Sequence, residues 1–430
     1  MPAPRLLLAA GGAGWEARLL PVLAVPGSPV TLARRCVDLP DLVVAAVAGQ
    51  GTVAAVSAGL PGLDADVVAR LVEAGVAVLA VAEDAASASR MAGLGVEQAL
   101  DAGTVTADPA VLVARAAGLG VGGLRPSDGS GDPTVLRVAA TSGEPDPGGG
   151  CLVAVWGPTG APGRSTVALG LAAAAAAAGT ETVLVDADVY GGATAQMLAV
   201  LDELSGLLAA ARAASTGALD PTALAEAARQ VSPRLRVLTG LPRADRWTAL
   251  GPAALRGVLG RARQAAPLVV VDCGFCVEQD EELSYDTAAP RRNGATLTTL
   301  DEADLVLLVG SADPLGLARL ARARHDLRDR VPTAQVRLVV NRVRGGLGWS
   351  RDDVSRTLLR AIGEVPLAYL PLDQAAVDAC WISGQTLPEA ATQSALARAV
   401  SELAVEVGRE LGLPGVPTQA SGRRRAGLRS

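Results

Sequence analysis

The middle of the chain joins an apolar run, a glycine-rich loop and a helical segment in direct succession. Leu152–Val155 predicts a buried strand, the loop spans Gly157–Thr166, and the alanine run Ala172–Ala178 lies in the predicted helix that follows. Backbone N–H groups at the start of a helix form a cradle for anions, and glycines let phosphate oxygens approach closely. The arrangement predicts a phosphate-binding P-loop on a parallel α/β sheet. An ordinary turn rich in Gly and Pro is the alternative.

The loop lacks the lysine that a P-loop normally places against the phosphates. The chain contains no lysine at all, so its 38 basic residues are all arginine. Arg164 occupies the lysine position, and its planar, bulkier fork makes the exchange non-conservative. We expect Ser165 to ligate Mg²⁺ and Thr166 to approach the α-phosphate. The predicted nucleotide contacts in the loop are Gly157, Thr159, Gly160, Ala161, Pro162, Gly163, Arg164, Ser165 and Thr166.

Three carboxylates follow two further apolar strands. Val183–Val185 ends in Asp186 and Asp188, and Leu268–Val271 ends in Asp272, which is the Walker B pattern. The carboxyl ends of parallel strands meet at one edge of a sheet, so these groups are expected beside the loop. We predict that Asp186 supports Mg²⁺ or its water and that Asp188 orients an attacking water. Alternatively, one of the pair only caps the next segment. The predicted metal residues are Ser165, Asp186 and Asp272, and the predicted catalytic residues are Arg164, Asp186 and Asp188.

In order and spacing these motifs resemble the deviant-Walker ATPases of the ParA/MinD family, most closely the actinobacterial CpaE/TadZ branch. The family loop reads lysine-Gly-Gly-x-Gly-lysine-Thr-Thr. Thr159 stands at its first, signature lysine, and Arg164 stands at the second. The paired aspartates and the Walker B aspartate also match. The resemblance covers about residues 151–410.

The resemblance implies further site residues and a mode of action. Asn341, followed by Arg342, matches the strand end whose Asn typically reads the adenine edge, while Pro371 and Asp373 fall where a family loop flanks the base. It implies ATP and Mg²⁺ as cofactors and a homodimer that closes on ATP. The family's signature lysine reaches the partner's phosphates. Thr159 is too short for that contact, so slow or absent hydrolysis is expected.

The apolar runs predict two α/β domains. Residues 1–116 resemble the receiver-like domain of CpaE/TadZ proteins. The first and third strands lead into Ala9–Gly12 and Ser57–Gly59, which hold no acidic residue, and without lysine phosphoryl acceptance is not expected. A docking or dimerising role is more plausible. The expected divisions are a receiver-like domain at 1–116, a flexible linker at 117–150, an ATPase domain at 151–412 and a disordered basic tail at 413–430.

Periodicity also places individual elements. Asp64 is a candidate N-cap for a helix over Ala65–Ala74, with Gly75 as its stop. A final helix over Ser394–Leu411 carries an apolar stripe at Leu396, Val400, Leu403 and Val407. Strands are predicted at Leu6–Leu8, Val30–Leu32, Thr52–Val56, Val76–Val81, Gln98–Leu100, Leu152–Val155, Thr182–Val185, Arg236–Leu238, Leu268–Val271, Leu305–Val309, Val336–Val340 and Leu367–Leu370.

Composition narrows the location and the partners. The net charge of -6 gives no reason to expect attraction to nucleic acid. Five scattered cysteines suggest reduced thiols in a cytoplasmic protein. No apolar run approaches the roughly 20 residues of a membrane span, and the tail Ser421–Ser430 is too polar for an amphipathic membrane helix. We expect a cytoplasmic protein, placed at a pole or near the membrane only through partners.

Three functions remain open at this point. The first is an ATP-dependent factor that positions a pilus, secretion or septum-related machine, docking through the receiver-like domain. The second is a nucleotide-independent scaffold with a decayed site. The third is a chromosome-partitioning ATPase that binds DNA, for which Arg319–Arg330 could form a basic stripe. Cys273–Cys276 is a CxxC with low expectation of redox or metal use, and Glu278–Glu282 is an acidic loop that could face a partner.

Overall fold

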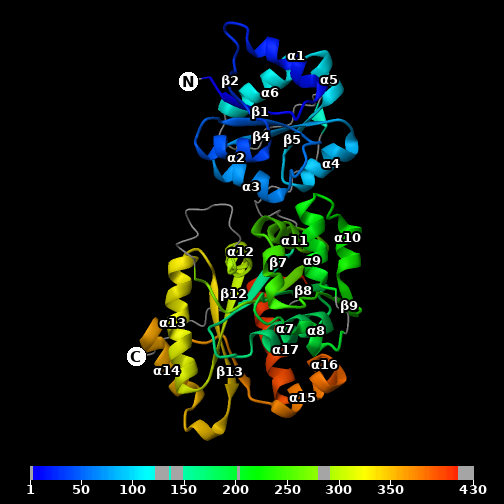
Figure 1. Ribbon diagram of the computed structural model, residues 1–430. Coiled ribbons are helices and arrows are strands. Elements are labelled where there is room, and N and C mark those ends of the chain that lie inside the picture. Colours follow the sequence, from blue (N-terminus) through cyan, green and yellow to red (C-terminus); the bar gives the residue numbers. More distant parts are fainter. Residues whose placement is uncertain (1–2, 122–134, 137–148, 201–203, 279–290, 415–430) are drawn as a thin grey trace, which may run out of the picture. The chain divides into compact units, whose positions relative to one another are not determined.

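In the computed structural model the chain folds around two β-sheets (Figure 1). The structure describes residues 3–121, 135–136, 149–200, 204–278 and 291–414. Most of the expected linker, most of the acidic run and nearly all of the expected basic tail lie outside these ranges. Within them, helix α6 continues to Val121 and a short strand, β6, lies inside the stretch expected to be linker.

The N-terminal sheet has six strands in the order β2-β1-β3-β4-β5-β6. The first five are parallel, and their order is the flavodoxin-like arrangement that receiver proteins share. β6 adds an antiparallel edge that the sequence analysis did not predict. The elements are β1 (Arg5–Ala9), α1 (Gly14–Leu23), β2 (Thr31–Arg35), α2 (Leu39–Val47), β3 (Val53–Ser57), α3 (Ala65–Glu73), β4 (Ala77–Ala82), α4 (Ala85–Gly93), β5 (Gln98–Asp101), α5 (Ala102–Ala107), α6 (Ala110–Val121) and β6 (Val135–Leu136).

Aspartates cap the starts of four of these helices, and Asp101 does so for α5. The side chains of Asp38, Asp64 and Asp84 accept backbone N–H groups in the first turns of α2, α3 and α4. Such caps satisfy donors that a helix start otherwise leaves unpaired. The predicted cap at Asp64 is confirmed, and the chain leaves α3 through Gly75, whose φ is 74°.

Alternation along β1 gives the N-terminal sheet two buried faces. Leu7 and Ala9 belong to the core that contains α2, α3 and α4, whereas Leu6 and Leu8 belong to the core of α1, α5 and α6. Side chains along a strand point to opposite faces, so a run of apolar residues needs helices on both sides.

The C-terminal sheet has eight strands in the order β14-β13-β12-β7-β11-β8-β10-β9. All neighbours are parallel except β9, an antiparallel edge that was not predicted. The elements are β7 (Cys151–Trp156), α7 (Arg164–Ala177), β8 (Thr182–Ala187), α8 (Thr194–Met197), α9 (Gly206–Ser215), α10 (Pro221–Ala227), β9 (Arg229–Ser232), β10 (Leu235–Leu238), η1 (Ala244–Ala249), α11 (Pro252–Ala265), β11 (Leu268–Cys273), α12 (Gly294–Glu302), β12 (Leu305–Ser311), α13 (Pro314–Arg330), β13 (Val336–Val343), η3 (Gly345–Leu347), α14 (Arg351–Ile362), β14 (Ala368–Pro371), α15 (Gln374–Ser383), α16 (Leu387–Ala390) and α17 (Ala395–Glu410).

Helix α7, which follows the loop, is buried almost throughout by one face of this sheet and by α17 (Figure 1). The predicted stripe on α17 is confirmed, because Leu396, Val400, Leu403 and Val407 are all buried in the same core. Gly170 is the point of close approach, where an added methyl group would lie 3.2 Å from Val400. The small side chains of α7 therefore let α17 pack closely behind the loop.

Register places the predicted site at one edge of the sheet. β11 lies between β7 and β8, and Asp272 pairs with Val155 on one side and with Asp186 on the other. The loop leaves the same edge at Gly157, where an added methyl group would overlap the carbonyl oxygen of Val309 in β12. The loop and the carboxylates are thus fixed by the sheet itself. Among the described helices, none combines the length and the apolar character needed to cross a bilayer.

Candidate functional site

The backbone of the loop turns tightly and adopts positive φ angles at three positions. Gly160 and Gly163 have φ angles of 101° and 98°, and Ala161 has a φ of 50°. These values lie in the region that L-residues rarely adopt, which explains the two glycines. α7 begins at Arg164, so the N–H groups of its first turn face the loop without intrahelical partners. The sequence analysis expects the anion cradle at these N–H groups, and anion binding there remains a prediction.

Asn341 braces the loop from β13. Its Nδ2 donates a hydrogen bond to the carbonyl oxygen of Pro162 at 2.8 Å. A methyl group on Gly163 would overlap the same amide. The side chain is buried, and the structure therefore uses it to hold the loop, whereas the family resemblance implied contact with the adenine edge.

Arg164 is folded back onto the loop that precedes it. Its Nη1 donates to the carbonyl oxygens of Gly157 and Pro158 at 3.3 and 3.2 Å, and its Nε donates to the carbonyl of Cys273 at 3.1 Å. Its Nη2 lies 3.5 Å from the carboxylate of Asp188. Only 11% of the side chain is exposed. The guanidinium is thus held at the loop by oxygens on several sides.

The paired aspartates make different contacts. Asp188 accepts N–H bonds from Tyr190 and Gly191 with one oxygen and faces Arg164 with the other. Asp186 accepts from the N–H groups of Asp188 and Thr194 at 3.3 and 3.1 Å. Both side chains therefore shape the turn after β8, and their predicted roles toward Mg²⁺ and water remain predictions.

Asp272 is fully buried, and neither of its carboxylate oxygens has a hydrogen-bond partner. Burial raises its pKa well above the usual range, and the charge of Asp186 raises it further, while Ser165 and Arg164 offset part of the rise. Burial likewise raises the pKa of Asp186 to about 6, with Asp188 adding to the effect. A buried carboxylate without partners is costly unless a cation compensates it.

These residues fit a magnesium ion. Mg²⁺ prefers oxygen ligands and keeps several waters, so it needs only one or two protein groups. Asp272 offers two unsatisfied oxygens, and Ser165 is close enough to the carboxylate to affect its pKa. No cluster of three or more His, Cys, Asp or Glu side chains that could hold a metal occurs among the described residues. The site therefore suits an ion held partly by phosphate and water, and less an all-protein metal cage.

Two of the remaining predicted contacts lie at the ends of neighbouring strands, and the third lies at the start of a helix. Arg342 is partly buried at the end of β13, and Pro371 ends β14. Asp373 accepts the N–H of Ala376 at 3.2 Å and caps α15. The structure therefore gives Asp373 a local structural task.

A narrow cavity of about 60 Å³ adjoins the loop on the side of β12 and β13. It is lined by loop residues Pro158, Thr159, Gly160 and Pro162 and by Ser311, Asp313, Gly316, Arg319 and Arg342. Arg319 was predicted only as a member of a basic stripe on a helix. Only the order of strands in the sheet could have placed Arg319 at the loop. β12 leads into α13 and is the neighbour of β7, which leads into the loop.

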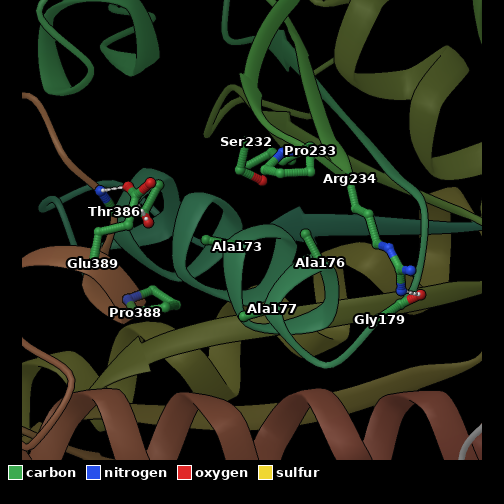
Figure 2. Close-up of a pocket in the computed structure, with 11 residues that line it drawn as sticks. Ala173, Ala176, Ala177, Gly179, Ser232, Pro233, Arg234, Thr386, Pro388 and Glu389 are labelled. Atoms are coloured by element: carbon green, nitrogen blue, oxygen red, sulfur yellow. Dashed lines mark hydrogen bonds between the residues drawn. The ribbon is translucent and has the colours of Figure 1, made fainter.

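A larger cavity of about 290 Å³ lies elsewhere, beside the last turns of α7 (Figure 2). Its floor is Ala173, Ala176 and Ala177, and Arg234 closes one end by donating to the carbonyl of Gly179 at 2.6 Å. Small apolar side chains line most of it. Because it lies at the opposite end of α7 from the loop, it takes no part in the site described above.

The thiols after β11 are poorly suited to redox chemistry. Cys273 is fully buried and Cys276 partly so, and neither is in a disulfide. Burial raises the pKa of Cys273 well above its usual range, and the charge of Asp272 adds to this. The reactive form of cysteine is the thiolate, so a raised pKa makes Cys273 inert. Between the two cysteines in the chain, Phe275 packs against Tyr190 with ring centroids 4.8 Å apart and ring planes tilted by 44°.

The buried carboxylates predict how stability depends on pH. An acid whose pKa rises on folding stabilises the protein below its unfolded pKa, and that contribution is lost as pH rises through the folded pKa. Without Mg²⁺ the protein should therefore be less stable when measured at about pH 8 than at about pH 4, and the contribution of Asp186 is lost as pH rises through its folded pKa of about 6. Asp272→Asn should be more stable than the wild type at about pH 8, by on the order of 2 kcal/mol.

Urea unfolding in chelator at both pH values measures this effect. The matched control is Asp352→Asn, which changes an exposed aspartate on α14 and should leave the pH dependence unchanged. A wild type whose stability stays level or rises over this range would contradict the prediction.

The fold can now be compared with known proteins. A search against protein-family models and one against curated proteins returned no match. Among solved structures, a ParA-family ATPase from Chlorobium tepidum aligns with a TM-score of 0.51 at 17% identity, over 59% of this chain and 98% of that protein. The cell-division ATPase MinD of Pyrococcus furiosus aligns at 0.48 and 17%, covering 61% and 99%. MinD of Pyrococcus horikoshii, solved with Mg-ADP, aligns at 0.48 and 16%, covering 61% and 97%.

Identity at this level shows the fold alone. The alignment with the ParA-family ATPase confirms the predicted class, a P-loop NTPase sheet with helices on both faces.

Proposed function

We propose that this chain is an ATP-binding localisation factor of the ParA/MinD kind, related to the CpaE/TadZ branch. The observation that carries the proposal is Asp272, a fully buried carboxylate that lacks a hydrogen bond of normal geometry and lies close enough to Ser165 beside the P-loop for that hydroxyl to lower its pKa. A protein that had lost its nucleotide would have little reason to keep this group ionisable and unsatisfied. The ParA-type fold supports the same assignment.

In this proposal the loop N–H groups and Arg164 bind the phosphates of ATP, and Ser165 and Asp272 hold Mg²⁺. The ion, when bound, neutralises negative charge that builds up on the phosphates. Asp188 already holds Arg164 at 3.5 Å, and it is suited to fix a water on the same side of the loop. Asn341, Arg342 and Pro371 lie at the strand ends that would border the base, and Asp373 lies at the start of α15 just beyond them.

Binding ATP would close a homodimer, and the dimer would dock on a pilus, secretion or septum-related machine through the N-terminal domain. Hydrolysis would release it. Thr159 offers no charge to a partner's phosphates, so turnover is proposed to be slow. The protein would work in the cytoplasm, reaching a pole or the membrane only through its partners.

A role in coating DNA is less well supported by the arginines of α13. Arg324 pairs with Glu364 at 2.8 Å, and Arg328 lies 4.0 Å from the same carboxylate. Arg319 lines the cavity beside the loop. The stripe is therefore partly engaged within the protein. DNA binding depends on many free cations that replace counterions on the phosphates.

A scaffold that needs no nucleotide is the second candidate. It is favoured by one specific observation, the three carbonyl oxygens and one carboxylate of the same chain that surround Arg164. The two candidates differ in a single measurable property, which is whether Mg²⁺ and ATP stabilise the folded chain.

Thermal unfolding with Mg²⁺ and ATP makes this distinction. We expect ATP at about 100 times its Kd to stabilise the chain by about 2.7 kcal/mol, because a ligand that binds only the folded state shifts the equilibrium. Ser165→Ala should lose most of the Mg²⁺-dependent part. Ser383→Ala, which removes an exposed hydroxyl on α15, is the control. No shift of the wild type at millimolar nucleotide would favour the scaffold.

Steady-state phosphate release tests the proposed slow turnover. Losing one well-placed cation at a phosphoryl-transfer site can lower the rate by on the order of 10³. The wild type should therefore be slow, Arg164→Ala and Asp188→Ala should be slower still, and Thr159→Lys should be faster if the signature position matters. A wild-type rate equal to that of lysine-bearing ParA proteins would show that the slow-turnover proposal is wrong.

Light scattering on a sizing column tests dimer closure. With Mg²⁺ and ATP the mass should double, whereas with ADP or without nucleotide it should not. Arg164→Ala should stay monomeric under all three conditions, because it removes a phosphate contact. The same mass in all three conditions for the wild type would exclude nucleotide-dependent dimerisation.

A further inference from the structure

Two arginines lie on the flank of the loop that is away from the aspartates. The sheet order places β12 and β13 on one side of β7, and β11 and β8, which carry the aspartates, on the other. Arg319, in the second turn of α13, and Arg342, at the end of β13, both line the cavity of about 60 Å³ that also contains Thr159. Thr159 brings no charge to this flank of the loop, and the positive charge there comes from α13 and β13.

Arg319 lies directly against the loop. A methyl group placed on Gly160 would overlap its Nη1 and lie 3.3 Å from its Cζ. The three heavy atoms nearest to that methyl position all belong to Arg319. The guanidinium thus lies beside the backbone of the loop, and the missing side chain of Gly160 makes this position possible.

Neither arginine is neutralised by a carboxylate in the described part of the chain. Asp313, the acidic group in the same cavity, accepts a 2.5 Å bond from the Ser311 hydroxyl and a 2.9 Å bond from the Gly316 N–H. It therefore serves as the cap of α13. By contrast, Arg324 on the same helix forms an ion pair with Glu364 at 2.8 Å. Arg319 and Arg342 are the cations left available at the loop's outer flank.

The backbone at Arg342 is strained. Its φ is 59°, and the pairing of β13 with β14 is irregular between Val340 and Val343. A non-glycine residue in this region costs on the order of 1 kcal/mol or more, so surrounding structure must enforce it. The kink re-aims the end of β13, and Arg342 lines the cavity as a result. Strain of this kind is typical of ligand sites.

We propose that Arg319 and Arg342 bind phosphoryl oxygens of the nucleotide held in the loop, and that this charge comes from the same chain. The inference rests on the proposed function. Guanidinium groups bind phosphate bidentately, which suits this purpose. Arg164 is held by Asp188 and by three backbone carbonyls, so part of its charge is already compensated. A single chain would then hold ATP without a lysine from a second copy.

Calorimetric titration of the full chain with Mg·ATP and Mg·ADP tests the inference. Arg319→Gln keeps the length of the side chain and removes its charge. We expect it to weaken ATP binding by about 10- to 100-fold, the usual effect of losing a charged hydrogen bond. ADP, with one phosphate fewer, should be affected less. Arg319→Lys should recover part of the affinity, and Arg342→Gln should resemble Arg319→Gln.

The matched control is Arg322→Gln, which removes the next arginine on α13, an exposed residue outside the cavity. It should bind both nucleotides within about twofold of the wild type. Thermal unfolding of each variant without nucleotide shows whether folding is intact. If Arg319→Gln is less stable, the difference between its ATP and ADP affinities decides, because losing a purely structural arginine would weaken both nucleotides to the same extent.

The outcomes separate this inference from the function beneath it. A wild type that binds ATP, with Arg319→Gln binding it equally well, overturns the inference and leaves the proposed function standing. A wild type that binds neither nucleotide overturns both. If Arg319→Gln lowers the ATP affinity only at protein concentrations at which the wild type is dimeric, a second copy supplies the contact, which overturns the same-chain assignment.

Discussion

The parallel register of β7, β11 and β8 is the constraint on which the site depends. It sets Asp272 opposite Asp186 on one neighbour and opposite Val155 on the other. Side chains alternate along a strand, so a slip of one residue would turn Asp272 to the other face of the sheet. The runs of valine and leucine that fix this register, buried on both faces, therefore also fix the distance between the loop and its acidic partners.

The same register lowers the stability of the folded chain, because it buries two carboxylates next to each other. Two carboxylates that are paired in a buried sheet cannot both ionise easily, and burial raises the pKa of each. The well-packed apolar core around these groups offsets this cost. Positions that break a local packing rule in this way tend to be functional ones. The glycines around them serve the same end, because Gly192 and Gly240 let the backbone close over Asp186. Stability and binding thus make opposite demands on these few residues.

Sequence reasoning found what short-range patterns control. Every strand it predicted is present, since long apolar runs in a parallel sheet are unambiguous, and the cap at Asp64 and the stripe on α17 follow from local rules. It missed the antiparallel edges β6 and β9, which span only two and four residues. It also missed the bond from Asn341 to Pro162 and the position of Arg319, because both depend on how separate elements meet across the sheet.

A chain without lysine must distribute positive charge differently around a phosphate loop. A lysine is a flexible point charge, whereas an arginine is a rigid fork that must be satisfied on several sides. At position 164 that fork is satisfied by the carbonyls of Gly157, Pro158 and Cys273 and by Asp188, which fixes it in place. A cation fixed in this way can bind a phosphate group, but it cannot move with negative charge that shifts during a reaction. Under the proposed function, arginines on α13 and β13 would complement it only from a distance set by the sheet, and this geometry would favour holding a nucleotide over hydrolysing it.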